Sequence, residues 1–328
     1  EVERVTVDDI KFNGNKALIE IIGEDIDKIY LDKVKTILLS PESIKRHNDL
    51  KIVYTPIHGT GIKLIPRCLQ EIGFTNVSLV EEQTVISGNF PTVASPNPEE
   101  PAALDMAIQK AKAIDADIVM ASDPDADPMG IAVKNDKGEW MLVNGNQTDL
   151  MFTYYIIRRR KELGLLKGNE FMVKTIVTSE LVKTICDKNN VELFDCYTGF
   201  KWIAAVVRDM EGKKQYIGGG EESYGYMPAE FVRDKDAVAC CALMAEMTAW
   251  AKDNGKTIFE MLQDIYLEYG YSKEKGISVV RLGKTGAEEI VAMMRNFRSN
   301  PPKEIAGSAV KVIKDYQSQE MIDVATGK

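Results

Sequence analysis

The feature that most constrains the fold is an alternation of short apolar segments with segments of helical periodicity, which begins near residue 51. Residues 51–55 have the length and apolar character of a buried strand, residues 62–72 repeat their apolar positions as a helix does, and residues 77–80 form the next candidate strand. Strands that alternate with helices predict βαβ units and a largely parallel sheet.

A further helix is expected to begin at Asn97, because Asn is a frequent capping residue, Pro98 suits the first helical position and acidic residues follow in the first turn. One buried face of this helix would consist of four apolar residues, namely Leu104, Ala107, Ile108 and Ala111. Residues 118–121 are the strand that comes next.

The same alternation returns after Asn144. It predicts strands at residues 171–177, 191–194 and 215–217, helices at residues 181–188 and 198–207, and a long buried helix at residues 236–252. A third unit is expected to contain a strand at 278–282, a helix at 287–297 and a strand at 309–313. The pattern therefore predicts consecutive three-layer α/β/α domains with mixed, largely parallel sheets.

Composition excludes several classes of function. Lys and Arg number 41 against 50 Asp and Glu, which gives a net charge of -9 and argues against a general nucleic-acid or anionic-membrane surface. No apolar run approaches the roughly 20 residues that span a bilayer. The five cysteines include no C-x-x-C pair, which favours a reducing, cytoplasmic setting over a disulfide framework. The only histidines are His47 and His58, too few for a multi-histidine metal site.

An acidic loop follows the strand at residues 118–121. Asp123, Asp125 and Asp127 alternate with other residues at the point where open α/β sheets hold their ligands. Carboxylates at this spacing can converge on one hard cation, Mg²⁺ before Mn²⁺ or Ca²⁺, and leave positions open for phosphate oxygens. The alternative is a solvated acidic turn. An EF-hand is excluded, because the glycine at its loop position 6 and the glutamate at position 12 are absent.

A glycine-rich loop at residues 218–225 carries Glu221 and Ser223, whose side chains suit the adjacent hydroxyls of a sugar. The alternative is a glycine-rich hairpin with exposed acids, and the pattern does not fit G-x-G-x-x-G. Lys201 and Lys235 lie in two further segments that could face a phosphate, although a surface position is the simpler interpretation for either lysine.

Taken together, these segments resemble the α-D-phosphohexomutases, in particular the phosphoglucomutase/phosphomannomutase branch. The shared motifs keep the family's order over about residues 30 to 270, and they are YTPIHGTG at 54–61, SPNPEEP at 95–101, DPDAD at 123–127, NGNQ at 144–147, TGFK at 198–201, GEESYG at 220–225 and RDKD at 233–236. The resemblance implies four domains around one cleft in the whole enzyme. This chain would hold a tail of the first domain at 1–29, the second at 30–140, the third at 141–270 and a truncated α+β start of the fourth at 271–328.

The resemblance also implies an activity, which is the interconversion of hexose 1-phosphate and hexose 6-phosphate through a phosphoserine and a hexose 1,6-bisphosphate. Asp123, Asp125 and Asp127 would then hold Mg²⁺. Sugar hydroxyls would contact Glu221 and Ser223, and Lys235 would lie beside the phosphoryl group in transfer. The remaining substrate contacts would come from Thr198, with Lys201 and Lys174 as further cations in the cleft.

The sequence also departs from the family pattern. It has no phosphoserine loop and no fourth-domain phosphate loop, so the chain is expected to be inactive alone and to need the missing first and fourth domains as partners. Ser95 resembles that serine only superficially, since its context matches the second-domain motif. Pro128 follows Asp127 where the family has Arg, which leaves a non-catalytic sugar-phosphate-binding paralogue as the alternative. An unrelated Mg²⁺-dependent hydrolase would lack a convincing nucleophile.

Overall fold

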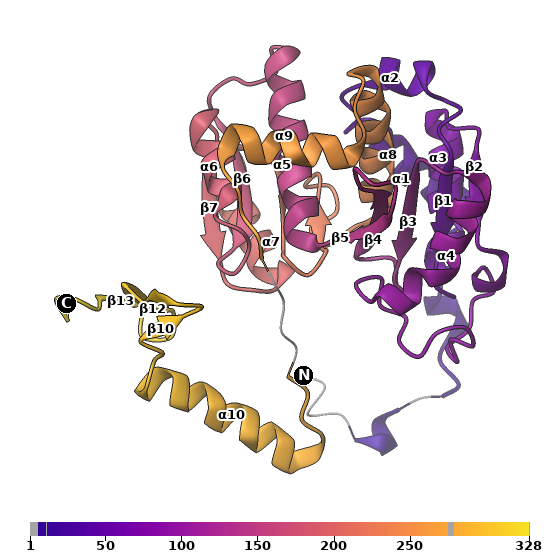
Figure 1. Cartoon of the computed structure of the whole chain (residues 1–328). Helices are drawn as coiled ribbons and strands as arrows, with labels where there is room; N and C mark the ends of the chain where they lie inside the picture. The colour runs from indigo at the N-terminus through magenta and orange to yellow at the C-terminus, as the bar shows by residue number, and fades with distance from the viewer. Residues whose placement is uncertain (1–5, 11, 275–278, 328) are drawn as a thin grey trace. The chain divides into compact units, whose positions relative to one another are not determined.

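The computed structural model describes residues 6–10, 12–274 and 279–327, which divide into two compact units at the boundary between residues 274 and 275 (Figure 1). The first unit contains two α/β modules, each built on its own sheet. No helix among the described residues is long and apolar enough to cross a membrane.

The sheet of the first module has five strands, in the order β2 (Val77–Leu79), β1 (Ile52–Thr55), β3 (Ile118–Ser122), β4 (Met129–Lys134) and β5 (Trp140–Val143). Strand β1 pairs in parallel with β2 and β3, whereas β3–β4 and β4–β5 are antiparallel. The buried strands β1 and β3 were expected, and the antiparallel edge formed by β4 and β5 was not.

Helices cover both faces of this sheet. Helix α4 (Pro101–Ile114) packs on one face, where Val53 and Val119 point. The opposite face carries alternate residues of the same strands and packs against α3 (Ile65–Ile72) and α8 (Ala237–Asp253). This alternation is the expected consequence of the two-residue period of a strand.

The sheet of the second module has the order β7 (Glu192–Cys196), β6 (Glu170–Thr175), β8 (Gln215–Gly220) and β9 (Tyr226–Met227). Strand β6 is parallel to both neighbours, and only β9 runs antiparallel. The prediction of an α/β fold with mixed sheets is therefore confirmed; the second sheet is largely parallel, whereas the first has two parallel and two antiparallel pairings.

Helices also cover both faces of the second sheet, one helix on one face and three on the other. Helix α7 (Phe200–Met210) packs on one face, against Phe171 and Val173 of β6. The other face lies under α5 (Gly145–Glu162), α6 (Leu181–Lys188) and α9 (Ile258–Tyr269). The helices α5 and α9 were not expected from the sequence.

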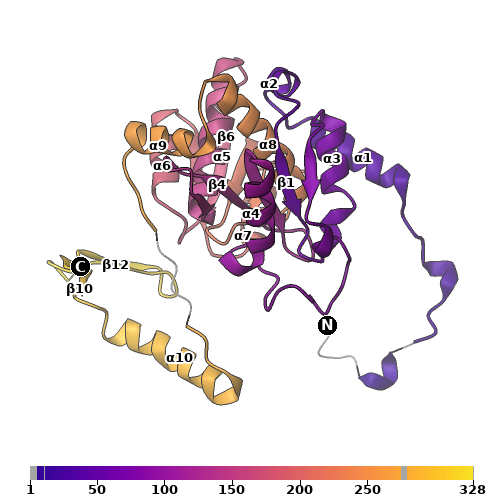
Figure 2. The same cartoon turned by 45° about the vertical axis from the view of Figure 1, so that its right-hand side comes forward.

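Helix α8 joins the two modules. It is buried on every side except at its C-terminal end, and it packs against α2 (Pro41–Arg46), α3 and α1 (Glu24–Lys35) of the first module. It also contacts β9 and α9 of the second module (Figures 1 and 2). One continuous hydrophobic core therefore runs through both modules. The buried carboxylate of Glu246 on α8 accepts hydrogen bonds from the backbone N–H groups of Leu39 and Ser40, at 3.0 and 2.6 Å.

One expected helix boundary is wrong. Helix α4 begins at Pro101 and not after Asn97, whose side chain instead accepts a hydrogen bond from the N–H of Glu99 at 2.9 Å. Glu100 has extended φ and ψ angles, as the residue before a proline usually does, and this stops the helix from starting earlier.

The second unit contains α10 (Gly283–Ser299) and two hairpins, formed by β10 (Glu304–Ile305) with β11 (Ser308–Ala309) and by β12 (Val312–Asp315) with β13 (Glu320–Asp323). The helix expected at 287–297 lies within α10. The strand expected at 278–282 is not formed by residues 279–282, and residue 278 lies outside the described residues. The strand expected at 309–313 is divided between β11 and β12. Short 3₁₀ turns complete the described elements, at Val7–Asp9, Lys16–Leu18, Thr60–Ile62 and Glu81–Gln83.

Candidate functional site

The acidic loop begins where the buried strand β3 ends. Ligand oxygens of Asp123, Asp125 and Asp127 all lie within 4.8 Å of one another. The loop closes on itself, because the N–H of Asp127 donates to a carboxylate oxygen of Asp123 at 3.0 Å and Ala126 adopts a positive φ of 61°. Convergent carboxylates on one loop are a donor set that fits a hard divalent cation.

The electrostatics of this loop also favour a cation. Burial raises the pKa of Asp123 to about 8, and a hydrogen bond with Asp125 adds to the rise. Crowded carboxylates of this kind retain a proton near neutral pH, because their negative charges repel one another in a partly desolvated site. A divalent cation would replace that proton and relieve the repulsion.

The loop that follows β1 is hydrogen-bonded to the backbone of the acidic loop. Thr60 donates two hydrogen bonds to the carbonyl oxygen of Pro124, from its N–H at 2.8 Å and from its hydroxyl at 3.1 Å. A Cβ atom on residue 59 would lie 2.4 Å from Cα of Pro124, so only glycine allows this approach. Thr60 and Gly59 therefore fix the backbone between the first two aspartates of the acidic loop.

His58 has a structural position in the same segment. Its ring nitrogens contact the carbonyl oxygen of Val85 and the hydroxyl of Thr92, both at 2.9 Å, and its side chain is buried. These contacts join the connection after β2 to the loop after β1, which contains Gly59 and Thr60. Ser95 lies further along this connection, where its hydroxyl donates to Glu100 at 2.9 Å.

The glycine-rich loop follows β8 and carries two acids with different partners. Glu221 is buried and accepts hydrogen bonds from the N–H of Gly199 at 2.6 Å and from the hydroxyl of Ser223 at 3.3 Å. Glu222 accepts hydrogen bonds from the hydroxyls of Thr175 and Thr178, at 2.9 and 3.2 Å. Glu221 is thus held toward the start of α7, and Glu222 toward the end of β6.

Lys235 connects the glycine-rich loop with the acidic loop. Its amino group lies 2.8 Å from a carboxylate oxygen of Asp127 and 5.2 Å from the ring centre of Phe200. The aliphatic part of Lys235 runs across Gly225, where a Cβ atom would lie 2.4 Å from Cδ of the lysine. The structure therefore brings a cation of the second module onto the acidic loop of the first.

A cavity of about 400 Å³ adjoins this contact. Its lining includes Thr60, Asp125 and Lys235, together with Lys63 on the side of the first module. The cavity places two lysines next to the acidic loop, and the acids Asp27, Asp125 and Asp236 line it as well.

The other predicted cations lie elsewhere. Lys174 is fully buried, and its amino group already contacts Glu180 at 3.1 Å, Asp195 at 3.2 Å and two backbone carbonyls at 3.3 Å. This geometry argues against the expectation that Lys174 supplies charge to a cleft. Lys201 and Thr198 are exposed around the start of α7, and the amino group of Lys201 lies over the ring of Trp202.

The sequence analysis missed several residues of this region. Glu99 lies near Glu222 and Tyr224, and burial, with the neighbouring charge of Glu222, raises the pKa of its carboxyl group. The motif at residues 95–101 marked the segment but gave no sign that it reaches the glycine-rich loop. The roles of Gly225 and Thr60 depend on contacts between distant segments, which no local pattern reports.

Known proteins resemble this chain in sequence and in fold. Residues 28–138 match the model of phosphoglucomutase/phosphomannomutase α/β/α domain II, and residues 144–269 match the model of domain III. A phosphoglucomutase of Staphylococcus aureus (strain USA300) is 39% identical over 274 residues, which are 84% of this chain and 49% of that protein. A phosphoglucomutase of Staphylococcus haemolyticus is 34% identical over 310 residues, which are 94% of this chain and 56% of that protein.

Solved structures share the fold at lower identity. A putative phosphomannomutase from Thermus thermophilus aligns with a TM-score of 0.61 and 22% identity over 75% of this chain and 52% of that chain. The Paramecium phosphoglucomutase pp63/parafusin aligns with a TM-score of 0.59 and 15% identity over 90% of this chain and 51% of that chain. The chain spans about half the length of the curated relatives, at 49% and 56%. With both domain models matched in order, the chain belongs to the phosphoglucomutase/phosphomannomutase family of α-D-phosphohexomutases.

Proposed function

We propose that this chain supplies the metal-binding and sugar-binding parts of a phosphohexomutase, which interconverts hexose 1-phosphate and hexose 6-phosphate of glucose, mannose or both. The observation that carries the proposal is the 2.8 Å contact between Lys235 and Asp127, because this lysine also packs across Gly225 and so brings the glycine-rich loop next to the acidic loop. The domains would lie at residues 30–140 and 141–270, after a tail at 1–29 and before an incomplete domain at 271–328.

In this proposal Asp123, Asp125 and Asp127 hold Mg²⁺, which when bound neutralises phosphate oxygens. Glu221 accepts hydrogen bonds from sugar hydroxyls, and Ser223 donates a hydrogen bond to one. Because the carboxylate of Glu221 already accepts a hydrogen bond from the N–H of Gly199, its orientation is fixed. Thr198 and Lys201 contact a sugar phosphate at the start of α7. Lys174 is left out, since its amino group is buried against acceptors of its own.

Lys235 provides the positive charge at the transferred phosphoryl group. Its amino group is held between Asp127 and Phe200, so its position is fixed before a substrate arrives. A preorganised cation of this kind stabilises developing charge in a transition state without reorganisation. Pro128 offers no such charge, and the cation beside Asp127 is Lys235 and not Lys201.

Metal binding tests the first half of the proposal. Calorimetry with Mg²⁺ and Mn²⁺ should detect one weak site in this chain and no site in Asp125→Ala. Asp136→Ala is the matched control, because Asp136 is an exposed acid in the turn between β4 and β5. Equal binding by the chain and by Asp125→Ala would refute the metal site.

Sugar-phosphate binding tests the second half. Ser223→Ala should weaken the binding of glucose 1-phosphate about 2- to 10-fold, the usual effect of one hydrogen bond. Ser299→Ala, on α10 of the other unit, is the control and should leave the affinity unchanged. If both variants bind glucose 1-phosphate as tightly as the parent chain, the glycine-rich loop does not bind the sugar.

Turnover tests the activity itself. A coupled assay with glucose 1-phosphate, a trace of glucose 1,6-bisphosphate and Mg²⁺ should find no mutase turnover by this chain, since the phosphoserine motif is absent from these 328 residues. Turnover that Ser95→Ala abolishes would overturn this expectation and identify Ser95 as the nucleophile.

The second candidate is a non-catalytic protein that binds sugar phosphates, and Pro128 is the observation that favours it. In a form that also carries the serine and phosphate loops, Pro128→Arg should raise turnover by about 10²- to 10³-fold if a missing guanidinium limits the rate. Equal turnover with either residue would mean that Lys235 already provides the charge.

A further inference from the structure

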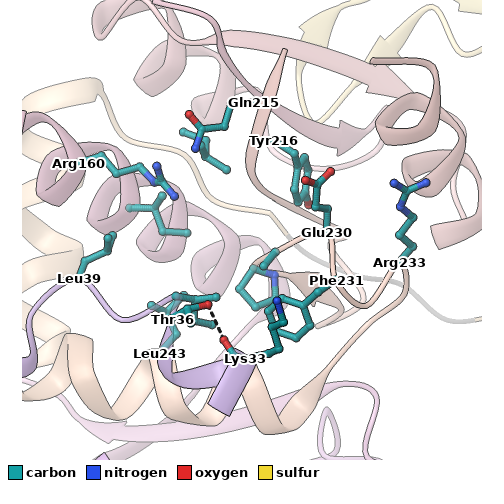
Figure 3. Close-up of a pocket in the computed structure, with 15 residues that line it drawn as sticks. Lys33, Thr36, Leu39, Arg160, Gln215, Tyr216, Glu230, Phe231, Arg233 and Leu243 are labelled. Atoms are coloured by element: carbon teal, nitrogen blue, oxygen red, sulfur yellow. Dashed lines mark hydrogen bonds between the residues drawn. The ribbon is translucent and has the colours of Figure 1, made fainter. Parts of the chain in front are cut away.

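A cavity of about 500 Å³ lies away from the candidate site, at the other end of strand β8. Its lining comes from the end of α1 and the connection to α2, from α5, from the start of β8, from the segment after β9 and from α8 (Figure 3). The glycine-rich loop begins within the C-terminal half of β8, whereas this cavity adjoins the first three residues of β8, Gln215, Tyr216 and Ile217. Its volume falls in the range of small-molecule sites.

Arg160 is the residue that makes this cavity unusual. Its side chain is half-buried, and its Nε–H is fully buried with no hydrogen-bond partner among the described residues. Burial lowers the pKa of the guanidinium, which reflects the cost of holding this charge away from water. Figure 3 shows the guanidinium directed into the cavity, on the side where Gln215 lies.

The charges around the cavity leave an excess of positive charge. Arg233 is engaged by Glu211 at 3.1 Å, whereas neither Lys33 nor Arg160 has an ion pair in the part of the chain that the structure describes. Glu230 is the one acid in the described lining, and it is exposed. Two cations without ion pairs in the lining of one cavity favour the binding of an anionic group.

Part of the rest of the wall is apolar. Ile156, Ile217 and Leu243 are buried core residues that reach the cavity, and the ring of Phe231 lies opposite Arg160 in Figure 3. An inorganic anion would leave this wall in contact with water. A molecule that joins an anionic group to an apolar or aromatic body would instead satisfy the guanidinium and cover the wall.

We propose that this cavity binds a small organic anion, whose phosphate or carboxylate group is held by Arg160 and Lys33 and whose body packs against Ile217, Leu243 and Phe231. The planar guanidinium can hold either group through two parallel hydrogen bonds. The proposal does not depend on the proposed mutase function, because it uses none of the residues assigned to the metal or the sugar.

Calorimetry with phenyl phosphate tests the proposal on the whole chain. Phenyl phosphate should bind at one site, more tightly than inorganic phosphate, which lacks the body, and than phenol, which lacks the charge. Benzoate is measured in parallel. The comparison of its affinity with that of phenyl phosphate shows whether the cavity prefers a carboxylate or a phosphate group. Failure of both phenyl phosphate and benzoate to bind would overturn the proposal.

Variants then locate the site. Arg160→Gln should weaken phenyl phosphate binding about 10- to 100-fold, as expected for a lost charge-assisted hydrogen bond. Arg158→Gln is the matched control, because Arg158 lies on the same helix but is exposed and pairs with Glu162, and its affinity should not change. Equal affinities of the parent chain and Arg160→Gln would refute the assignment.

Two further variants cover the remaining outcomes. If thermal unfolding shows that Arg160→Gln does not fold, Lys33→Gln takes its place, and an unchanged affinity there would overturn the proposal. The double variant Asp125→Ala and Ser223→Ala should keep the affinity for phenyl phosphate. Loss of binding in that double variant would place the ligand at the candidate mutase site and refute a separate cavity.

Discussion

Replacing Asp149 by Asn should remove a strong pH dependence of stability. Asp149 lies in the first turns of α5 and is only 2% exposed, and its carboxylate oxygens and the nearby hydroxyl of Thr153 are buried without a well-formed hydrogen bond among the described residues. It packs against the glycine-rich loop, where a Cβ atom on Gly220 would lie 3.4 Å from its Cγ. Burial raises the pKa of Asp149 to about 7, although the charge of Lys174 acts in the opposite direction.

The magnitude follows from the difference in pKa between the folded and unfolded chain. Between 3.8 and about 7 the folded chain binds one more proton than the unfolded chain, so the free energy of unfolding falls as the pH rises through this window. The stabilisation is fully present below 3.8 and lost above about 7. A difference of roughly 3 pKa units corresponds to a loss on the order of 4 kcal/mol.

The assay is urea unfolding at several pH values between 5 and 8, for the parent chain and for Asp149→Asn. Other groups titrate alike in both proteins, so their difference isolates this carboxyl group. The variant should gain stability relative to the parent chain by about 3 kcal/mol as the pH rises from 5 to 8. Asp209→Asn, an exposed change of the same charge on α7, is the control. Parallel pH curves for the parent chain and Asp149→Asn would show that Asp149 is ionised in the folded protein, which would refute the reasoning.

Substitutions at three more positions test contacts in the core and in the candidate site. Glu246→Ala leaves the N–H groups of Leu39 and Ser40 without an acceptor in the shared core, whereas the hydroxyl of Tyr155 keeps Ser40 Oγ as a partner. This variant should lower the free energy of unfolding by about 3–5 kcal/mol in urea unfolding, and Glu246→Gln by less. Gly225→Ala should push Lys235 from Asp127 and tighten Mn²⁺ binding about 2- to 5-fold in calorimetry, because the lysine competes with the cation; weaker binding would contradict this. Thr60→Val should weaken Mn²⁺ binding about 2- to 10-fold through loss of its hydroxyl contact to the acidic loop, while Thr60→Ser keeps it; equal affinities of both variants would count against a positioning role.

The sequence predicts the buried strands well, because apolar runs such as residues 52–55 and 118–122 allow few other structures. Strands β4 and β5 could not be predicted in this way. The first begins after Pro128 and contains Gly130, and the second is only half-buried, so neither has a strong pattern of its own. Their pairing with β3 depends on tertiary context.

The candidate site divides in the same way. The acidic loop can be predicted from the sequence, because its carboxylates are close in sequence and follow a buried strand. Two ion pairs cannot be predicted from the sequence, because each joins segments that meet only in the folded chain. They are the contact of Lys235 with Asp127 and that of the buried Lys174 with Asp195. A lysine within an apolar strand gives no sign of which distant acid will neutralise it.

The central position of α8 has a consequence for synthesis on the ribosome. The first module contains its last strand by residue 143, yet Glu246, which binds the N–H of Ser40, lies 206 residues after that serine. At about 5–20 residues per second, the nascent first module, whose last strand ends at residue 143, waits roughly 5–20 s for Glu246. During that interval the sheet face that α8 later covers is bare, so the emerging chain is most exposed to aggregation then, and chaperones would act on it in this window.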